Sequence, residues 1–561
     1  MKEKVYAAAA LVSGCTLFYP IGERANSDVG AGAGAGGTTM SDGGGRETSS
    51  DRAASGCASD QECRGDGDGA PVICRLTDNT CQTLETEECR VVYPRTWDDP
   101  HAVVLGAYTL LPPANPEDFD LVWDYELAVK EFDDRGGLPD TNGARHTLVT
   151  VICNNDPALV AMDSEFLSRS LDHLTDVVGV AAIVADLPPK DLIDAFHRTQ
   201  AKGKDVFFLS PGPADNPLAS LDDAGRVWSM LGLAVDLAPA YKALLKRIEL
   251  YIRSMEPTVG MLRVALVKSS DPTEPRHEQL GELIDALTQT SLGNPNPNRL
   301  EFNGADLTMN TDHGYYREFV IDSAPDSAAA TGRAILDSFQ PHVVISMTGP
   351  AFTHFDPVAA FDGVADTIES LQTGDRKYPF FMLSPVNASA WAEVVQTITS
   401  IGQTYPDVHR RFLGIDVATA DDLTLYNDYR YRLLAVHSNA RERTENYYDP
   451  IYYMAYATTR AGVSRALTGG DVLAGMQNTL GGMRYDVGPG PIPAVFSAIQ
   501  QKEPILLVGT MGAPNFNQQT GTRVNRAALY CFPLSSQEPL QQVQVYEGGT
   551  WVGDFGCYQG F

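Results

Sequence analysis

The chain has 561 residues, of which 43% are hydrophobic, 20% charged and 9% aromatic, the balance of a soluble globular protein too long for one core. Its formal net charge of −30 argues against a nucleic-acid partner, because phosphate binding needs a surplus of Lys and Arg. Anionic lipid headgroups also repel so acidic a chain, so any membrane attachment has to come from a separate anchor.

The first fifteen residues predict export. Lys2 and Lys4 flank the start of a short apolar run, 5–12, which is followed by small residues and Cys15. This order is typical of a secretory signal, and the run is too short to span a bilayer. Small residues before a cysteine resemble the bacterial lipobox, which implies a lipid on Cys15; the alternative is an ordinary signal peptide with a coincidental cysteine. Thr16 replaces the aspartate associated with inner-membrane retention, which favours the outer membrane.

The cysteine pattern also favours an oxidising compartment. Setting Cys15 aside leaves an even number of the nine cysteines, as disulfides require. A zinc site is the alternative, but the chain has no Cys-x₂-Cys pair and no histidine within the cysteine cluster. The suggested pairs are Cys89 with Cys153 and Cys531 with Cys557. The remaining expected disulfide cysteines, whose connectivity stays open, are Cys57, Cys63, Cys74 and Cys81.

Composition divides the first 90 residues. Residues 16–55 are rich in Gly, Ala and Ser and cannot bury apolar area, so they are expected to form a flexible linker. Residues 56–90 are expected to form a small disulfide-rich module.

From about residue 101, strand-like apolar runs alternate with amphipathic helical patterns, which predicts α/β layers with parallel sheets. A fresh strand at residue 263, after a long helix, predicts a second sheet. The expected strands are 103–110, 147–152, 177–184, 206–210, 263–268, 342–347, 379–384 and 412–417. The expected helices are 119–135, 192–201, 239–254, 278–289 and 328–339.

Three short segments share features with one family of α/β proteins. Residues 132–138 read Phe-Asp-Asp-Arg-Gly-Gly-Leu, residues 206–213 read Val-Phe-Phe-Leu-Ser-Pro-Gly-Pro, and residues 448–457 read Tyr-Asp-Pro-Ile-Tyr-Tyr-Met-Ala-Tyr-Ala. They resemble a helix end with its glycine turn, a strand end and a helix of the type 1 periplasmic binding proteins, in particular the branched-chain amino-acid (leucine/isoleucine/valine) receptors of ABC transporters. The resemblance runs from about residue 101 to 532.

The resemblance implies two Rossmann-like lobes joined by three crossings that act as a hinge. Lobe 1 would comprise 100–255 plus 440–530, lobe 2 would comprise 256–440, and a disulfide-closed tail would follow at 531–561. It further implies a monomeric solute-binding lipoprotein of the periplasm or cell envelope that holds a small polar solute between its lobes and serves an ABC permease. A sensory or protein-interaction receptor that kept the fold without transport is the alternative. No cofactor and no metal are implied.

The loops after the strands supply the candidate binding residues. Each departs from the amino-acid receptors: residues 184–189 lack a hydroxyl, Pro213 has no N–H, residues 270–275 lack a tyrosine, and residues 382–387 lack an acid. The set therefore suits a neutral, amidic or cationic solute, since a buried carboxylate needs donors and a buried ammonium needs an acceptor. The candidates are Asp186, Ser210, Gly212, Ala214, Asp215, Thr348, Gly349, Ser384 and Asn387.

Two alternatives remain open for these residues. Asp186 and Asp215 serve equally well as helix caps, and Ser210 and Asn387 as partners of local backbone. The chain is not expected to be an enzyme, because its only near match to a nucleophile elbow, Gly462-Val463-Ser464-Arg465-Ala466, lies in a helical stretch.

Overall fold

The computed structural model describes residues 56–64, 71–75, 78–272, 274, 276–289, 296–324, 326–353, 363–372, 377–389, 391–402, 408–418, 423–440, 443–463, 466–532 and 541–553. The predictions for the signal segment, Cys15, the linker, Ser464 and Cys557 lie outside these residues. Within them, no helix is both long and apolar enough to cross a membrane.

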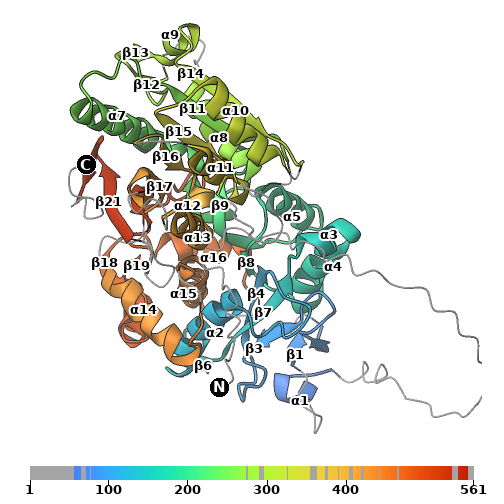
Figure 1. The fold of residues 1–561 in the computed structure, drawn as a ribbon. Coiled ribbons are helices and arrows are strands. Elements are labelled where there is room, and N and C mark those ends of the chain that lie inside the picture. The colour runs from blue at the N-terminus through green and yellow to red at the C-terminus, as the bar shows by residue number, and fades with distance from the viewer. Residues whose placement is uncertain are drawn as a thin grey trace, which may run out of the picture.

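The first lobe is built on a six-stranded sheet in the order β10-β9-β8-β4-β7-β3, with β3 alone antiparallel to its neighbour (Figure 1). Its central strands are continuous apolar runs because helices cover both faces. The strands are β3 (Val91–Tyr93), β4 (Val103–Thr109), β7 (Leu148–Asn154), β8 (Ala182–Ala185), β9 (Phe207–Ala214) and β10 (Val227–Leu233). The covering helices are α2 (Asp120–Asp133), α15 (Glu445–Ala461), α16 (Gly469–Gln477) and α17 (Ile492–Gln500) on one face, and α4 (Phe166–Asp172) and α5 (Pro189–Ala201) on the other.

The second lobe is built on an eight-stranded sheet in the order β14-β11-β15-β16-β17-β20-β21-β22. Its first five strands are parallel and the last three are added antiparallel, so the sheet is mixed. The strands are β11 (Val264–Ser269), β14 (Tyr316–Ile321), β15 (Val343–Met347), β16 (Phe380–Leu383), β17 (Phe412–Val417), β20 (Ala527–Cys531), β21 (Gln541–Glu547) and β22 (Thr550–Val552). The helices are α7 (Ala238–Met255) and α8 (His277–Thr288) on one face, and α10 (Ser327–Ser338), α11 (Val364–Leu371) and α13 (Trp391–Gly402) on the other.

The lobe boundaries differ from the predicted ones. The apolar face of α7 packs with strands of the second sheet, so the first boundary falls at 234–237 rather than at 255. Helix α14 (Leu423–Val436) instead adds Tyr429 and Leu433 to the first core. Strand β20 pairs with β17, so the second lobe also takes residues from 527 onward. The division into two lobes is as expected, and the exchanged segments follow the apolar faces of α7 and α14.

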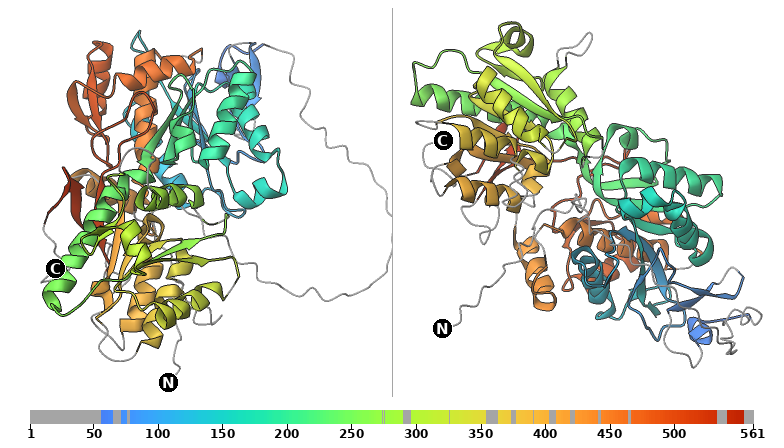
Figure 2. Two further views of the ribbon diagram at one scale, coloured as in Figure 1. Left: turned by 90° about the horizontal axis from the view of Figure 1, so that it is seen from above. Right: turned by 45° about the vertical axis from the view of Figure 1, so that its right-hand side comes forward.

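The chain passes between the lobes after β10, between β17 and α14, and between β19 (Ile505–Val508) and β20 (Figure 2). The first and third passages run side by side. The Ser229 N–H donates to the Gly521 carbonyl at 3.0 Å, and the Gly232 N–H donates to Asn525 Oδ1 at 2.8 Å. These adjoining segments agree with the hinge that the resemblance implied.

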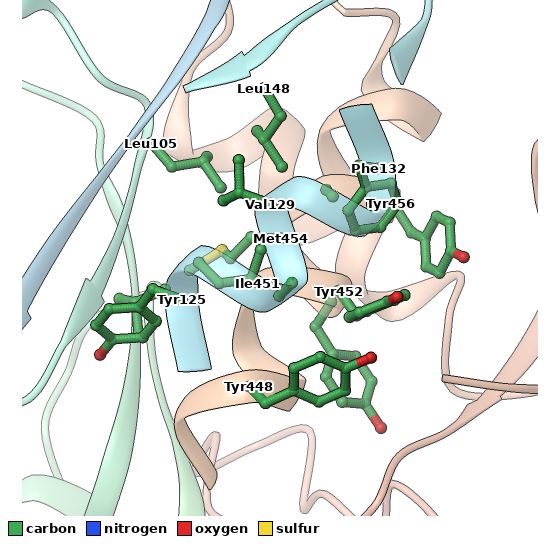
Figure 3. Packing of buried hydrophobic residues seen from close by; sticks show 14 of the residues in the cluster. Leu105, Tyr125, Val129, Phe132, Leu148, Tyr448, Ile451, Tyr452, Met454 and Tyr456 are labelled. Carbon is green, nitrogen blue, oxygen red and sulfur yellow. The ribbon is translucent and has the colours of Figure 1, made fainter. Parts of the chain in front are cut away.

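Helix α15 is buried along its length in the centre of the first lobe (Figure 3). Tyr448 and Tyr452, one turn apart on this helix, both donate to Glu131 Oε2 of α2 at 2.5 Å. Arg432 pairs with the other Glu131 oxygen at 2.7 Å. The buried carboxylate is thus fully bonded, as a charge in a protein interior has to be.

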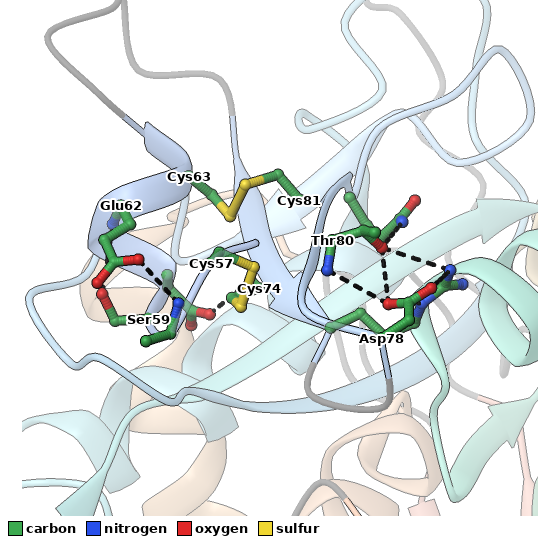
Figure 4. The surroundings of a disulfide bond; sticks show 12 residues. Cys57, Ser59, Glu62, Cys63, Cys74, Asp78, Thr80 and Cys81 are labelled. Carbon is green, nitrogen blue, oxygen red and sulfur yellow. Dashed lines mark hydrogen bonds and ion pairs between the residues drawn. A yellow bond between two sulfur atoms is a disulfide. The ribbon is translucent and has the colours of Figure 1, made fainter. Parts of the chain in front are cut away.

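The amino-terminal module is held by two disulfides, Cys57–Cys74 and Cys63–Cys81 (Figure 4). It contains α1 (Asp60–Arg64) and the hairpin β1 (Val72–Arg75) and β2 (Thr80–Thr83). Buried Asp60 accepts hydrogen bonds from the Cys74 N–H at 2.8 Å and the Trp97 indole at 3.2 Å, which fixes the module to the lobe.

The structure also bears on the two disulfides that the sequence suggested, Cys89–Cys153 and Cys531–Cys557. A third disulfide joins Cys89 to Cys153 of β7, the pairing suggested from the sequence. Cys531 is also disulfide-bonded.

The expected strand 177–184 is wrong over its first half. Residues His173–Val178 form a π-helix (η1) that ends at Gly179, whose φ of 80° only glycine adopts without strain. Strand β8 is therefore confined to Ala182–Ala185.

Candidate functional site

The carboxyl ends of both parallel sheets contribute to one part of the molecule. The term inter-lobe region is used here for the segments that follow these strand ends. In the first lobe they follow β7, β8 and β9, and the first turn of α15 is included. In the second lobe they follow β11, β15 and β16, and helix α8 is included. A direct hydrogen bond joins the two sides: the Asn216 N–H, just beyond β9, donates to Glu282 Oε1 of α8 at 2.9 Å. Open α/β sheets bind ligands beyond the carboxyl ends of their strands, so a ligand-binding site is expected in this region.

Three predicted residues of the first lobe lie on β9. The Ser210 hydroxyl accepts from the Gly212 N–H at 3.0 Å, and the Gly212 carbonyl accepts from the Ser229 hydroxyl at 2.5 Å. Ala214 ends the strand with its side chain fully buried. These contacts fix the shape of the β9 end.

The two predicted aspartates of the first lobe have different surroundings. Asp215 caps the short helix α6 (Asn216–Ala219) by accepting from the Leu218 N–H at 2.8 Å, and burial raises the pKa of its carboxyl. Half-buried Asp186 follows β8, and its carbonyl accepts from the side-chain amide of Asn155. Asp215 is therefore a helix cap, one of the two roles considered for it from the sequence.

The structure brings the predicted second-lobe residues together. The Ser384 hydroxyl donates to the Thr348 carbonyl at 2.7 Å and lies 3.0 Å from Asn387 Oδ1. The Asn387 amide donates to the Gly349 carbonyl at 2.8 Å, and its Oδ1 accepts from the Ser346 hydroxyl at 2.8 Å. All of these groups are buried and bond chiefly to one another, so the network holds the ends of β15 and β16 in register.

Two glutamates of the second lobe were missed by the sequence analysis. Glu274, after β11, accepts from the Gly349 N–H through Oε1, while its buried Oε2 has no hydrogen-bond partner in the protein. Glu282 accepts from the Asn216 N–H through Oε1, and its buried Oε2 is likewise unpartnered. Burial raises the pKa of both carboxyls, because it disfavours their charged form.

Three residues of the first lobe were missed as well. Asn155 follows β7 directly, and Asn446 in the first turn of α15 donates to the Pro211 carbonyl at 3.1 Å. Each leaves a buried Oδ1 without a partner, as does the adjacent Glu445 with its Oε2. Burial raises the pKa of Glu445 to about 6 although Arg443 opposes the shift. The strand-end rule predicts a site residue at Asn155, but Glu282 lies inside a helix and carries no such signal.

Arg443 connects the region to the second sheet. Its Nη2 donates to Asp416 Oδ2 at 3.2 Å and to the Tyr530 hydroxyl at 3.3 Å. The arginine thereby neutralises Asp416 where the third passage enters β20.

Two hollows lie elsewhere in the first lobe. A cavity of about 30 Å³ lies among Val103, Leu105 and Ala182 and has room for one water. A surface hollow of about 370 Å³ lies beside Lys204, Asp205 and Arg226, at the opposite ends of the strands, where Arg226 pairs with Asp205 at 2.7 Å. Neither contains a predicted site residue.

The sequence matches no family model and no curated protein. Solved structures with a similar fold include the branched-chain amino acid transporter substrate-binding protein of Streptococcus pneumoniae in complex with isoleucine (10% identity, TM-score 0.48, covering 79% of this chain and 99% of that one). A leucine-binding protein of Thermotoga maritima has 10% identity and a TM-score of 0.48, covering 80% and 99%. A solute-binding protein of an ABC transporter from R. palustris, in complex with benzoate, has 9% identity and a TM-score of 0.45, covering 81% and 95%.

Proposed function

We propose that the chain is an extracytoplasmic solute-binding protein that captures a small polar ligand between its two lobes for an ABC importer. The proposal rests on one observation: in the inter-lobe region, buried polar atoms of both lobes have no hydrogen-bond partner in the protein. Such atoms cost free energy unless something bonds to them, and they are therefore rare in folded proteins.

The way the lobes are connected supports the same function. Three passages close together allow one lobe to rotate on the other, and a ligand bonded to both lobes would favour the closed arrangement. The Asn216–Glu282 bond is one contact across the closing faces. Ligand capture is thereby converted into a change of shape that a permease can recognise.

We also propose that the protein is monomeric and is held at the cell envelope by a lipid on Cys15, in the outer membrane. The support is the order of charged, apolar and small residues before Cys15. Radiolabelled palmitate incorporation that disappears in a Cys15→Ser variant is the expected result; equal labelling of the variant would contradict it.

Native mass spectrometry of protein purified without refolding, together with a thermal-shift screen of small polar compounds, tests the binding function. A ligand at a hundredfold excess over its Kd should stabilise the fold by about 2.7 kcal/mol. The proposal fails if no small molecule copurifies and no compound in a broad screen raises Tm.

A sensory or interaction receptor is the second candidate. It is favoured by the second-lobe network, in which Thr348, Gly349, Ser384 and Asn387 bond chiefly to one another. A stable protein partner recovered from cell envelopes, with no small molecule bound, would support it over transport.

A further inference from the structure

Four side chains of the inter-lobe region share one arrangement. Each is fixed by a hydrogen bond to backbone through one polar atom and leaves a second, buried oxygen without a partner in the protein. Glu274 and Glu282 accept backbone N–H groups through Oε1 and leave Oε2, whereas Asn155 and Asn446 donate to carbonyls and leave Oδ1. The two amides cannot be turned over, because only their NH₂ groups can donate to the Asp186 and Pro211 carbonyls.

The hydrogen bonds place these side chains along one edge of the first sheet. Asn155 is held at Asp186, just beyond β8, and Asn446 is held at Pro211, in the later half of β9; these neighbouring strands are about 4.8 Å apart. Glu282 reaches the same β9 end from the second lobe through Asn216, and Glu274 precedes Glu282 on the segment that leads into α8. Both lobes therefore contribute buried, unpartnered oxygens to the inter-lobe region.

All four unpartnered atoms are hydrogen-bond acceptors. Asn155 and Asn446 are 7% and 2% exposed, so water has little access to them. The arginines of the region, Arg276 and Arg443, have interactions within the protein. Two of the four acceptors belong to carboxyl groups, so a ligand that bonds to all four has to supply the hydrogen-bond donors.

The spacing of the acids does not favour a metal ion. Among the described residues, the one group of three His, Cys, Asp or Glu side chains with ligand atoms within 4.8 Å of one another is Cys57, Cys63 and Cys81, which are disulfide cysteines. A divalent cation needs its oxygen ligands at about 2.0–2.6 Å, hence close together. An organic cation with several N–H groups can bond to oxygens that are farther apart.

We infer that the ligand of the proposed site is an organic cation, an amine or guanidinium compound without a carboxylate. Its N–H groups donate to Glu274 and Glu282 of the second lobe and to Asn155 and Asn446 of the first. This inference rests on the proposed binding function.

Isothermal titration calorimetry, which measures the Kd of each probe, tests the inference. The four probes are putrescine and agmatine as cations, isoleucine as a zwitterion and benzoate as an anion. At least one cation is expected to bind the wild-type protein more than tenfold more tightly than isoleucine or benzoate. Glu282→Gln keeps an oxygen for the Asn216 N–H and removes the charge, and it is expected to weaken cation binding at least tenfold. The matched control is Asp285→Asn, on the exposed side of the same helix, which should stay within twofold of wild type.

The outcomes separate the inference from the proposed function. Tighter binding of isoleucine or benzoate, or a copurified carboxylate, overturns the ligand class and leaves solute binding intact. A protein that binds no probe and carries no copurified small molecule overturns both. If Glu282→Gln melts far below wild type, Glu274→Gln supplies the same test, and cation affinity unchanged in that variant would overturn the inference.

Discussion

Gly232 stands where the first and third passages between the lobes touch, so its replacement by alanine tests the hinge directly. An alanine Cβ at this position would lie 1.9 Å from the Arg523 carbonyl oxygen and 3.1 Å from Asn525 Cγ. Ordinary contact begins at 3.4 Å, so the two backbones would have to separate by about 1.5 Å. That separation breaks the hydrogen bonds from Gly232 to Asn525 at 2.8 Å and from Asn525 to the Leu233 carbonyl at 3.1 Å.

The expected loss of stability is large enough to measure by calorimetry. Overpacking costs about 1–3 kcal/mol, and each lost hydrogen bond costs about 0.5–1.5 kcal/mol. A total near 4 kcal/mol lowers Tm by about 8 °C, at roughly 2 °C per kcal/mol for a chain of this size. The control is Gly260→Ala, whose Cβ meets nothing within 4 Å. A Gly232→Ala protein that melts within about 1 °C of the control would refute the close packing of the two passages.

Three other predictions concern disulfides, buried charge and pH. Replacing Cys89 and Cys153 by alanine opens a loop of 64 residues and should cost about 4 kcal/mol by loop entropy, measured by urea unfolding; an unchanged urea midpoint would contradict this. Buried Glu369 and Arg411 form a bidentate pair at 2.6 and 2.7 Å, so Glu369→Leu or Arg411→Met alone should lose about 3–5 kcal/mol while the double variant approaches wild type. Equal losses in the single and double variants, by the same assay, would rule out an uncompensated charge as the cause. Burial raises the pKa of Glu445 from 4.5 to about 6, so the folded state holds this proton more tightly than the unfolded state, and stability falls by about 2 kcal/mol as pH rises through that window. Glu445→Gln should make Tm less dependent on pH between pH 4 and 7. A slope of Tm against pH equal to that of the wild type would exclude Glu445 as the source of the dependence.

The buried parallel strands could be predicted because burial on both faces makes them continuous apolar runs. Strands β11 and β15 are of this kind. Strand β14 was missed because its edge position exposes Arg317 and Glu318, which break the apolar run. Strand β10 was missed because Ser229 and Gly232 interrupt it, and both residues serve the contact with the third passage.

The candidate site could be predicted only to the level of loops. The strand-end rule led to Asp186, Ser384 and their neighbours. It did not reveal which polar atoms already bond within the protein, because those partners come from residues far apart in the sequence. Glu282 illustrates the limit, since its importance depends on Asn216, which lies 66 positions away in the other lobe.

The exchange of segments between the lobes has a consequence for synthesis of the chain. Helix α15, the centre of the first core, is made only after the second sheet has been entered, and β20 to β22 of that sheet are made last. Each core is therefore complete only when almost all of the chain has left the ribosome. Contacts so distant in sequence form slowly, and the apolar surface that awaits them is exposed to chaperones in the meantime.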